Sequence, residues 1–213
     1  MIRLFHKTLY RKMSRSKRGR FVVEFINAAG LNGNLDTVKN CVERGIDVEA
    51  AKGEDAWRAI HSACSYGHLE IVQYLVENCR ANIVAREREG WTPLHLACQF
   101  GHLDIVQYIT RDRRIKVHTT TANDGTTALH VACQNGHLKV AQYLVEECGV
   151  DATVTTKCGE TPMTMARDHG KQHVVDYLSK ISADSGLSKF VSVEALRPPM
   201  PHFPIATETQ KEK

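Results

Sequence analysis

The sequence contains three copies of a His-x-x-Cys pattern, which pairs two side chains able to bind a metal ion or to take part in catalysis. The pattern occurs as His61 with Cys64, His95 with Cys98, and His130 with Cys133. Residues three apart on a helix share a face, so each pair could offer a zinc ion two ligands. A thiol beside an imidazole could also act as a nucleophile.

The other cysteines and the other motifs of the sequence support neither a zinc site nor a nucleophile. There are seven cysteines, an odd number, and no apolar secretion signal follows the basic N-terminus, which indicates a reducing compartment rather than a disulfide framework. The sequence contains no CxxC pair, no Ser/His/Asp arrangement outside the repeat described next, and no Walker loop, GxGxxG or HExxH motif. We therefore predict a protein that is not an enzyme and carries no cofactor.

The histidines and cysteines belong to a longer repeat. The three histidines lie 34 and 35 residues apart. Two other residue types keep this step, the glycines at Gly33, Gly67, Gly101, Gly136 and Gly170 and the tyrosines at Tyr74, Tyr108, Tyr143 and Tyr177. A fixed period of this length indicates stacked structural units, each of which touches only its neighbours.

Each unit reads as two helices joined by a tight turn. In the third unit Thr92 is a helix N-cap, and Pro93 takes the first helical position, where its missing N–H costs nothing. The first helix is predicted to end near Phe100, with Gly101 making the turn. Residues 103–109 then give the second helix a wide apolar face. The tyrosines are expected to pack this second helix against its neighbours, although a phosphorylation ladder is an alternative.

The segment from Gly90 to Ile109 resembles the ankyrin repeat, whose signature is T-P-L-H-x-A, through Thr92-Pro93-Leu94-His95 and the alanine that follows. The resemblance implies an all-α fold, an α-solenoid of stacked helix-turn-helix (ankyrin-type) repeats with short hairpin-like fingers between them. It extends over five predicted repeats, at about 22–52, 53–86, 87–121, 122–155 and 156–181.

The outer repeats and the second repeat depart from the family pattern. Asn27 and Thr164 take the histidine position in the first and last repeats, as capping repeats with a solvent-facing side would allow. Arg58 and Ala59 replace the Thr-Pro pair in the second repeat. We therefore expect the first helix of that repeat to be less firmly fixed at its start.

The resemblance also implies a structural role for the repeated histidines. In the family, this imidazole bonds the threonine of its own motif and the backbone of the neighbouring repeat. Stacked helices lie about 8–10 Å apart, too far for neighbouring units to close a zinc site at about 2.0–2.3 Å. We therefore expect no metal. The structural motif residues are Thr92, Pro93, His61, His95, His130, Gly67, Gly101 and Gly136.

Aromatic residues give the clearest signal of function. The only two tryptophans, Trp57 and Trp91, are 34 residues apart, and so are Tyr66 and Phe100, which precede the glycine turns. In the family, the fingers and the ends of the first helices line a concave groove that binds partners. The resemblance therefore implies a partner-binding surface, against the alternative that the tryptophans only cover neighbouring fingers. Its candidate residues are Trp57, Tyr66, Trp91, Phe100, Ser65, Gln99, Thr126, Gln134 and Asn135.

The two ends differ from the repeats in composition. Residues 1–20 hold eight of the 28 basic residues and no acidic residue, so the other 193 carry 20 basic against 24 acidic groups. This segment is predicted to be a basic disordered arm, with a nuclear signal, a nucleic-acid contact and a mitochondrial presequence as alternatives. Residues 182–213 hold four of the six prolines and are predicted to be a tail.

Together these features predict a non-enzymatic interaction module, an adaptor or scaffold of the kind used in signal transduction, that binds another protein in the groove of residues 21–181. No segment approaches the roughly 18 consecutive apolar residues of a membrane span. No small-molecule substrate is expected, and nucleic acid is expected to bind only through residues 1–20. The expected location is cytoplasmic. The alternative is a nuclear partner of transcription regulators.

Overall fold

The computed structural model describes residues 14–111, 115, 117 and 124–184. Within these ranges the chain forms ten helices and no strand. They divide into two compact units, of which the first ends at Arg88 and the second begins at Glu89. No helix in these ranges is long and apolar enough to cross a membrane.

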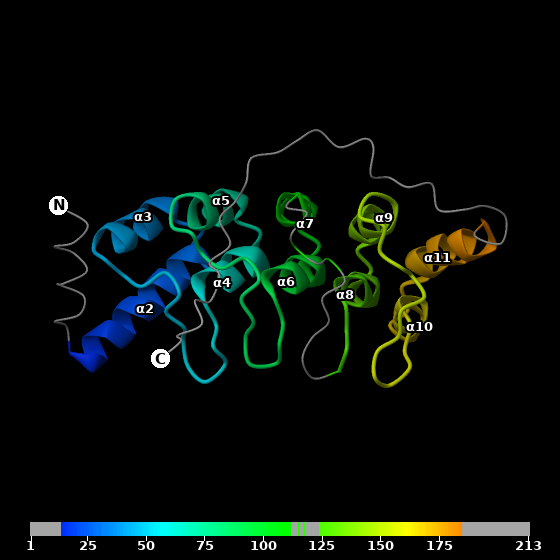
Figure 1. Cartoon of the computed structure of the whole chain (residues 1–213), viewed down its shortest axis with the longest axis horizontal. Coiled ribbons are helices and arrows are strands. Elements are labelled where there is room, and N and C mark those ends of the chain that lie inside the picture. Colours follow the sequence, from blue (N-terminus) through cyan, green and yellow to red (C-terminus); the bar gives the residue numbers. More distant parts are fainter. Residues whose placement is uncertain (1–13, 112–114, 116, 118–123, 185–213) are drawn as a thin grey trace, which may run out of the picture. The chain divides into compact units, whose positions relative to one another are not determined.

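The first unit contains two helix pairs. They are α2 (Arg15–Ala29) with α3 (Leu35–Glu43), and α4 (Ala59–Tyr66) with α5 (Leu69–Glu77). Helix α2 packs against both α3 and α4, and α5 packs against α4 and α3. The connection between α3 and α4 extends beyond the helices as a finger (Figure 1). A backbone bond from Lys52 N–H to the Trp57 carbonyl closes this finger as an antiparallel bridge.

The second unit contains three helix pairs. In chain order they are α6 (Pro93–Phe100) with α7 (Leu103–Thr110), α8 (Ala128–Asn135) with α9 (Leu138–Glu146), and α10 (Pro162–Asp168) with α11 (Gln172–Asp184). Helix α8 packs between α6 and α10, so the first helices of the pairs form one layer. Helices α7, α9 and α11 form a second layer beside it (Figure 1).

The ends of the first helices follow from local sequence. Thr92 and Thr127 hold extended backbone angles at the N-cap, and Pro93 follows Thr92 at the first helical position. Helix α6 ends at Phe100, as predicted, and Gly101 closes it with a left-handed φ of 76°. An alanine there would be strained, because a Cβ destabilises positive φ.

The core lies between the two helix layers of each unit. In α4 every residue from Ala59 to Cys64 is buried, and in α6 every residue from Pro93 to Cys98 is buried. The second helices bury one apolar face, for example Ile71, Val72 and Leu75 in α5. Helices of seven to nine residues are marginal in isolation, so this burial is what keeps them folded.

Helix α2 begins inside the segment that the sequence assigned to the disordered arm. The Ser14 hydroxyl accepts the Lys17 N–H at 3.4 Å and caps a helix that starts at Arg15. Phe21 and Phe25 are both buried, so packing further along the helix stabilises its earlier turns. Residues 15–20 are therefore helical, which corrects the expectation of disorder for them.

The other predicted boundaries are tested only in part. Residues 1–13 of the arm and 185–213 of the tail lie outside the described residues. Helix α11 continues to Asp184, past the predicted end of the repeats at residue 181. The described ranges hold five helix pairs, whereas the five repeat bounds themselves remain a prediction.

We expect Gly101→Ala to lower the free energy of unfolding more than Gly149→Ala does. Both glycines have positive φ, 76° and 67°, which costs alanine about 1–2 kcal/mol. A Cβ on Gly101 would also meet the imidazole of His137, whereas nothing lies within 4 Å of a Cβ on Gly149. Urea unfolding of both variants measures the difference. Equal losses would contradict the close approach of His137 to the turn.

Candidate functional site

The three repeated histidines are completely buried, at 0% exposure. Each uses Nδ1 to accept the backbone N–H of its own N-cap residue, Arg58 at 3.1 Å and Thr92 and Thr127 at 3.3 Å. The hydroxyls of the two threonines also lie 2.8 Å from the Nδ1 atoms of His95 and His130. A ring nitrogen that accepts these bonds carries no proton, so the proton of the neutral ring is on Nε2.

That proton binds the loop that follows in the chain. His61 Nε2–H donates to the Ala85 carbonyl at 3.1 Å, and His130 Nε2–H donates to the Glu160 carbonyl at 3.0 Å. Both nitrogens of these two rings are therefore occupied by protein hydrogen bonds. The part of the chain that the structure describes also contains no group of three or more His, Cys, Asp or Glu residues placed to hold a metal ion. The geometry is that of the structural role, not of a zinc ligand.

Burial shifts the pKa values of the same groups away from any catalytic use. It lowers the pKa of His61 to about 4 and also lowers the pKa of His130. It raises the pKa of the Cys133 thiol to about 12 and raises that of Cys64 and Cys98 as well. At neutral pH these imidazoles are uncharged and these thiols are protonated, so the buried thiols are not nucleophiles.

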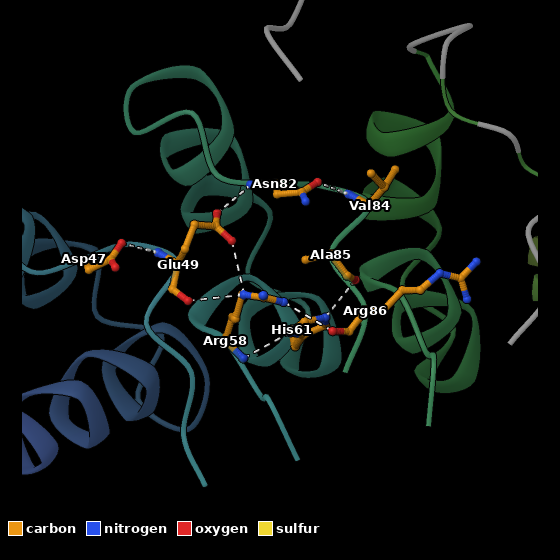
Figure 2. A network of polar contacts seen from close by, with 8 residues as sticks. All are labelled: Asp47, Glu49, Arg58, His61, Asn82, Val84, Ala85 and Arg86. Atoms are coloured by element: carbon orange, nitrogen blue, oxygen red, sulfur yellow. Dashed lines mark hydrogen bonds and ion pairs between the residues drawn. The ribbon is translucent and has the colours of Figure 1, made fainter. Parts of the chain in front are cut away.

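Arg58 anchors the start of α4 in a way that its sequence position did not suggest. Figure 2 shows its guanidinium between the loops on either side of the helix. Its Nε lies 3.2 Å from Glu49 Oε2, and its Nη1 donates to the Arg86 carbonyl at 3.3 Å. Glu49 Oε1 in turn accepts the Asn82 N–H at 2.8 Å. An ion pair to the loop before the helix and a hydrogen bond to the loop after it thus anchor the helix start, which the sequence expected to be less firmly fixed.

A second set of histidines has a positioning role that the sequence reasoning missed. His68, His137 and His173 each place Nε2 at 2.7–2.9 Å from a carbonyl at the end of the preceding pair's first helix. Those carbonyls belong to Gly30, Gln99 and Gly136. The available signal was the dipeptide Gly-His, which occurs at Gly67-His68, Gly101-His102 and Gly136-His137 in steps of 34 and 35 residues. It would not have found His173, which follows Gln172.

The exposed aromatic groups lie at the ends of the first helices. Tyr66 ends α4 and is 49% exposed, and Phe100 ends α6 and is 50% exposed. Leu31, which follows α2, is 62% exposed. In the first unit the Tyr66 ring lies beside Gly30, since a Cβ on that glycine would be 3.1 Å from Tyr66 Cδ2. Gly30 directly precedes the exposed Leu31 in the chain.

The tryptophans are held differently from this exposed set. Trp57 is half-buried, its ring is centred 5.6 Å from that of His61, and its Nε1–H donates to Ser62 Oγ at 2.7 Å. Trp91 is also half-buried and meets His95 edge-on at 5.9 Å. Both rings cover the buried histidine of their own repeat. This arrangement favours the covering role that the sequence left as the alternative.

The polar candidates are divided between surface and interior. Ser65, Gln99 and Gln134 are half-buried, and Asn135 is exposed. Thr126 is only 4% exposed, so its assignment to an accessible binding surface is wrong. It directly precedes the N-cap of α8 and is buried with it.

The tyrosines of the second helices pack as expected. Tyr143 and Tyr177 are half-buried, and each uses its hydroxyl at the edge of the packing. The Tyr143 hydroxyl lies 2.9 Å from Thr110 Oγ1, and the Tyr177 hydroxyl donates to Glu146 Oε1 at 2.9 Å. Burial raises the pKa of the Tyr177 hydroxyl, and the hydrogen bond to Glu146 is the next largest cause of this rise.

Comparison with known families agrees with this geometry. The sequence model of ankyrin repeats in three copies matches residues 25–121 and again residues 112–188, well over half of the chain. The chain belongs to the ankyrin-repeat family, and the predicted fold class, an all-α helical-repeat solenoid, is confirmed. No curated protein matches the chain as a relative.

We expect the stability of the fold to decrease as the pH falls from 7 to 5, with His61 as one cause. Because its folded pKa of about 4 is below the ordinary value of 6.5, the unfolded chain binds the proton first in this range. The contribution of His61 is about 2 kcal/mol between these pH values.

The matched variant is His61→Asn, which keeps a hydrogen-bond acceptor at the same position of the helix and removes the titration. Urea unfolding at both pH values should show a smaller loss for this variant than for the wild type. The same pH dependence in both proteins would contradict the assignment to His61.

Proposed function

We propose that this chain is a non-catalytic adaptor or scaffold whose side chains at the ends of the first helices bind a partner protein. Ankyrin repeats are generally protein–protein interaction modules, and the family match supports that coarse function directly. The proposal adds which residues form the contact surface and that the protein acts by binding alone.

The observation that carries the proposal is the exposure of Tyr66 and Phe100 at one repeat position. Each is the last residue of a first helix whose first six residues are all buried. Half of each side chain is open to solvent. Large aromatic groups held at the surface supply much of the affinity of protein interfaces, where tyrosine is among the enriched residues.

The scaffold holds these side chains in fixed positions before binding. Gly67 and Gly101 end the helices with a left-handed turn immediately after each aromatic residue. In the second unit, His137 fixes the end of α6 through the Gln99 carbonyl, one residue before Phe100. A surface that is already ordered loses little conformational entropy on binding, which favours affinity.

Charged groups at the finger of the first unit supply little of this affinity. Glu54 and Arg88 form an ion pair at 3.5 Å, and their side chains are 91% and 63% exposed. Exposed pairs of this kind contribute about 0–1 kcal/mol. They are better suited to orient a partner and to raise its association rate.

We propose a cytoplasmic location, because the cysteines of the described ranges are free thiols, the state that a reducing compartment maintains. A nuclear location is the alternative and rests on the basic residues before Phe21.

We expect the double variant Tyr66→Ala/Phe100→Ala to lose partner binding without losing stability. Removal of two interface anchors of this kind should weaken binding by at least about tenfold. Substitution of half-exposed side chains should change the free energy of unfolding by only about 0.5 kcal/mol each. The measurements are affinity capture of the partner by the full chain and thermal unfolding of the same samples.

Two controls make the result specific. Val84→Ala removes another exposed apolar side chain, away from the helix ends, and should leave capture unchanged. Trp57→Ala should lower stability, because it uncovers His61 and leaves Ser62 without the indole N–H. Capture of the same partners by the double variant as by wild type would refute the proposed surface.

A further inference from the structure

The start of α2 carries a dense run of basic residues, and the partner-binding proposal makes no use of it. Between Arg15 and Arg20 four of six residues are basic, and the first acidic residue of the whole sequence is Glu24. The structure makes this segment helical rather than extended. The first turns of α2 project away from α3, α4 and α5 (Figure 1).

The helix holds these charges at fixed positions. Lys17 and Arg20 are exposed, and their spacing of three residues places them on one face of the helix, with Cβ atoms about 5–6 Å apart. Arg18 is half-buried on the neighbouring face. No ion pair within the described ranges involves any of these three side chains.

A second element adds to the charge. Arg44, the C-cap of α3, is exposed and lies with its guanidinium 4.6 Å from the centre of the Phe21 ring. Arg18 is one helical turn before Phe21 on α2, so Arg44 extends the basic surface from a separate part of the chain. The acidic groups closest in sequence, Glu24 and Glu43, do not balance the four cations Lys17, Arg18, Arg20 and Arg44.

The chemistry of this basic surface favours a phosphate backbone over a membrane or a protein. A helix that binds a lipid surface inserts an apolar face, but the apolar face of α2 is buried in its own unit, with Phe21 5% and Val22 8% exposed. A protein interface would need apolar anchors for its affinity, and here the described surface offers only charge. Release of counterions from nucleic acid gives affinity from charge alone.

We propose that the basic surface formed by Lys17, Arg18, Arg20 and Arg44 binds the phosphate backbone of nucleic acid without sequence preference. The rest of the chain is mildly acidic, so a polyanion is directed to this surface. The interaction uses none of the residues proposed to bind the partner protein.

The test is the salt dependence of binding of the full chain to a labelled DNA duplex of arbitrary sequence, followed by fluorescence anisotropy. Each phosphate contact contributes about 0.9 to the slope of log affinity against log salt. The double variant Lys17→Gln/Arg20→Gln should therefore reduce that slope by about 2. Its loss of affinity between about 50 and about 200 mM salt should be roughly tenfold smaller than that of the wild type.

The matched control is Lys157→Gln/Lys180→Gln, which removes the same charge from exposed positions of the second unit. It should leave the slope nearly unchanged, and Lys17→Arg/Arg20→Lys should restore wild-type binding. Equal effects of the two glutamine variants would mean that only net charge matters and would overturn the proposal. Stronger binding to phosphatidylserine vesicles than to DNA, or no DNA binding at low salt, would also overturn it.

Discussion

A neutral imidazole that is bonded at both of its nitrogens is the interaction on which this fold depends. In the second repeat, His61 accepts the N–H of the residue that caps its own helix and donates to the carbonyl of Ala85 in the following loop. One buried side chain thus fixes the start of a helix of eight residues and joins it to the next part of the chain. A helix of this length has too few internal hydrogen bonds to be stable alone, so these external bonds and the buried face have to maintain it.

In the last repeat, a threonine at the histidine position makes the cap bond without the bond to a following loop. Thr164 Oγ1 accepts the Thr161 N–H at 2.8 Å and so keeps the cap, but its short side chain cannot reach a following loop.

The parts of this structure that the sequence predicted are those governed by neighbouring residues. The N-cap at Thr92, the proline after it and the left-handed glycine at Gly101 are local features with few alternatives. The anchoring of the start of α4 by Arg58 was not predicted, because the partners of Arg58 are distant in the sequence. Arg58 bonds Glu49 and the carbonyl of Arg86, nine and 28 residues away. The helical start of α2 was not predicted either, because a run of basic residues is typical of a disordered segment. The burial of Phe21 and Phe25, which stabilises the helix, is seen only in the structure.

The candidate binding residues were chosen by repeat position, which does not determine how exposed each side chain is. Repeat spacing identifies Trp57 and Tyr66 equally well, but only the structure shows that the first covers His61 and the second faces solvent. The difference follows from their places on the helix. Trp57 precedes the first turn, where the buried imidazole offers a ring to pack against. Tyr66 follows the buried turns and is beside a glycine, which offers no side chain to cover it. Thr126 is a further case in which repeat position did not predict exposure. Its position suggested a place on the surface, whereas its packing beside the cap of α8 buries it.

The two proposed surfaces depend on different physical forces, so they would respond to different conditions. Binding through Tyr66 and Phe100 would rest on burial of apolar area, which salt changes little. Binding through Lys17, Arg20 and Arg44 would rest on counterion release, which weakens steeply as salt rises. A protein with both surfaces could hold its protein partner across a range of ionic strength while its contact with a polyanion is gained or lost. The chain keeps the forces apart by composition, since eight of its basic residues precede its first acidic one and the repeats carry a small excess of acid. The proposed polyanion contact uses basic side chains at the start of α2 and the end of α3, and the proposed protein contact uses aromatic side chains, so each can be changed by substitution without altering the residues of the other.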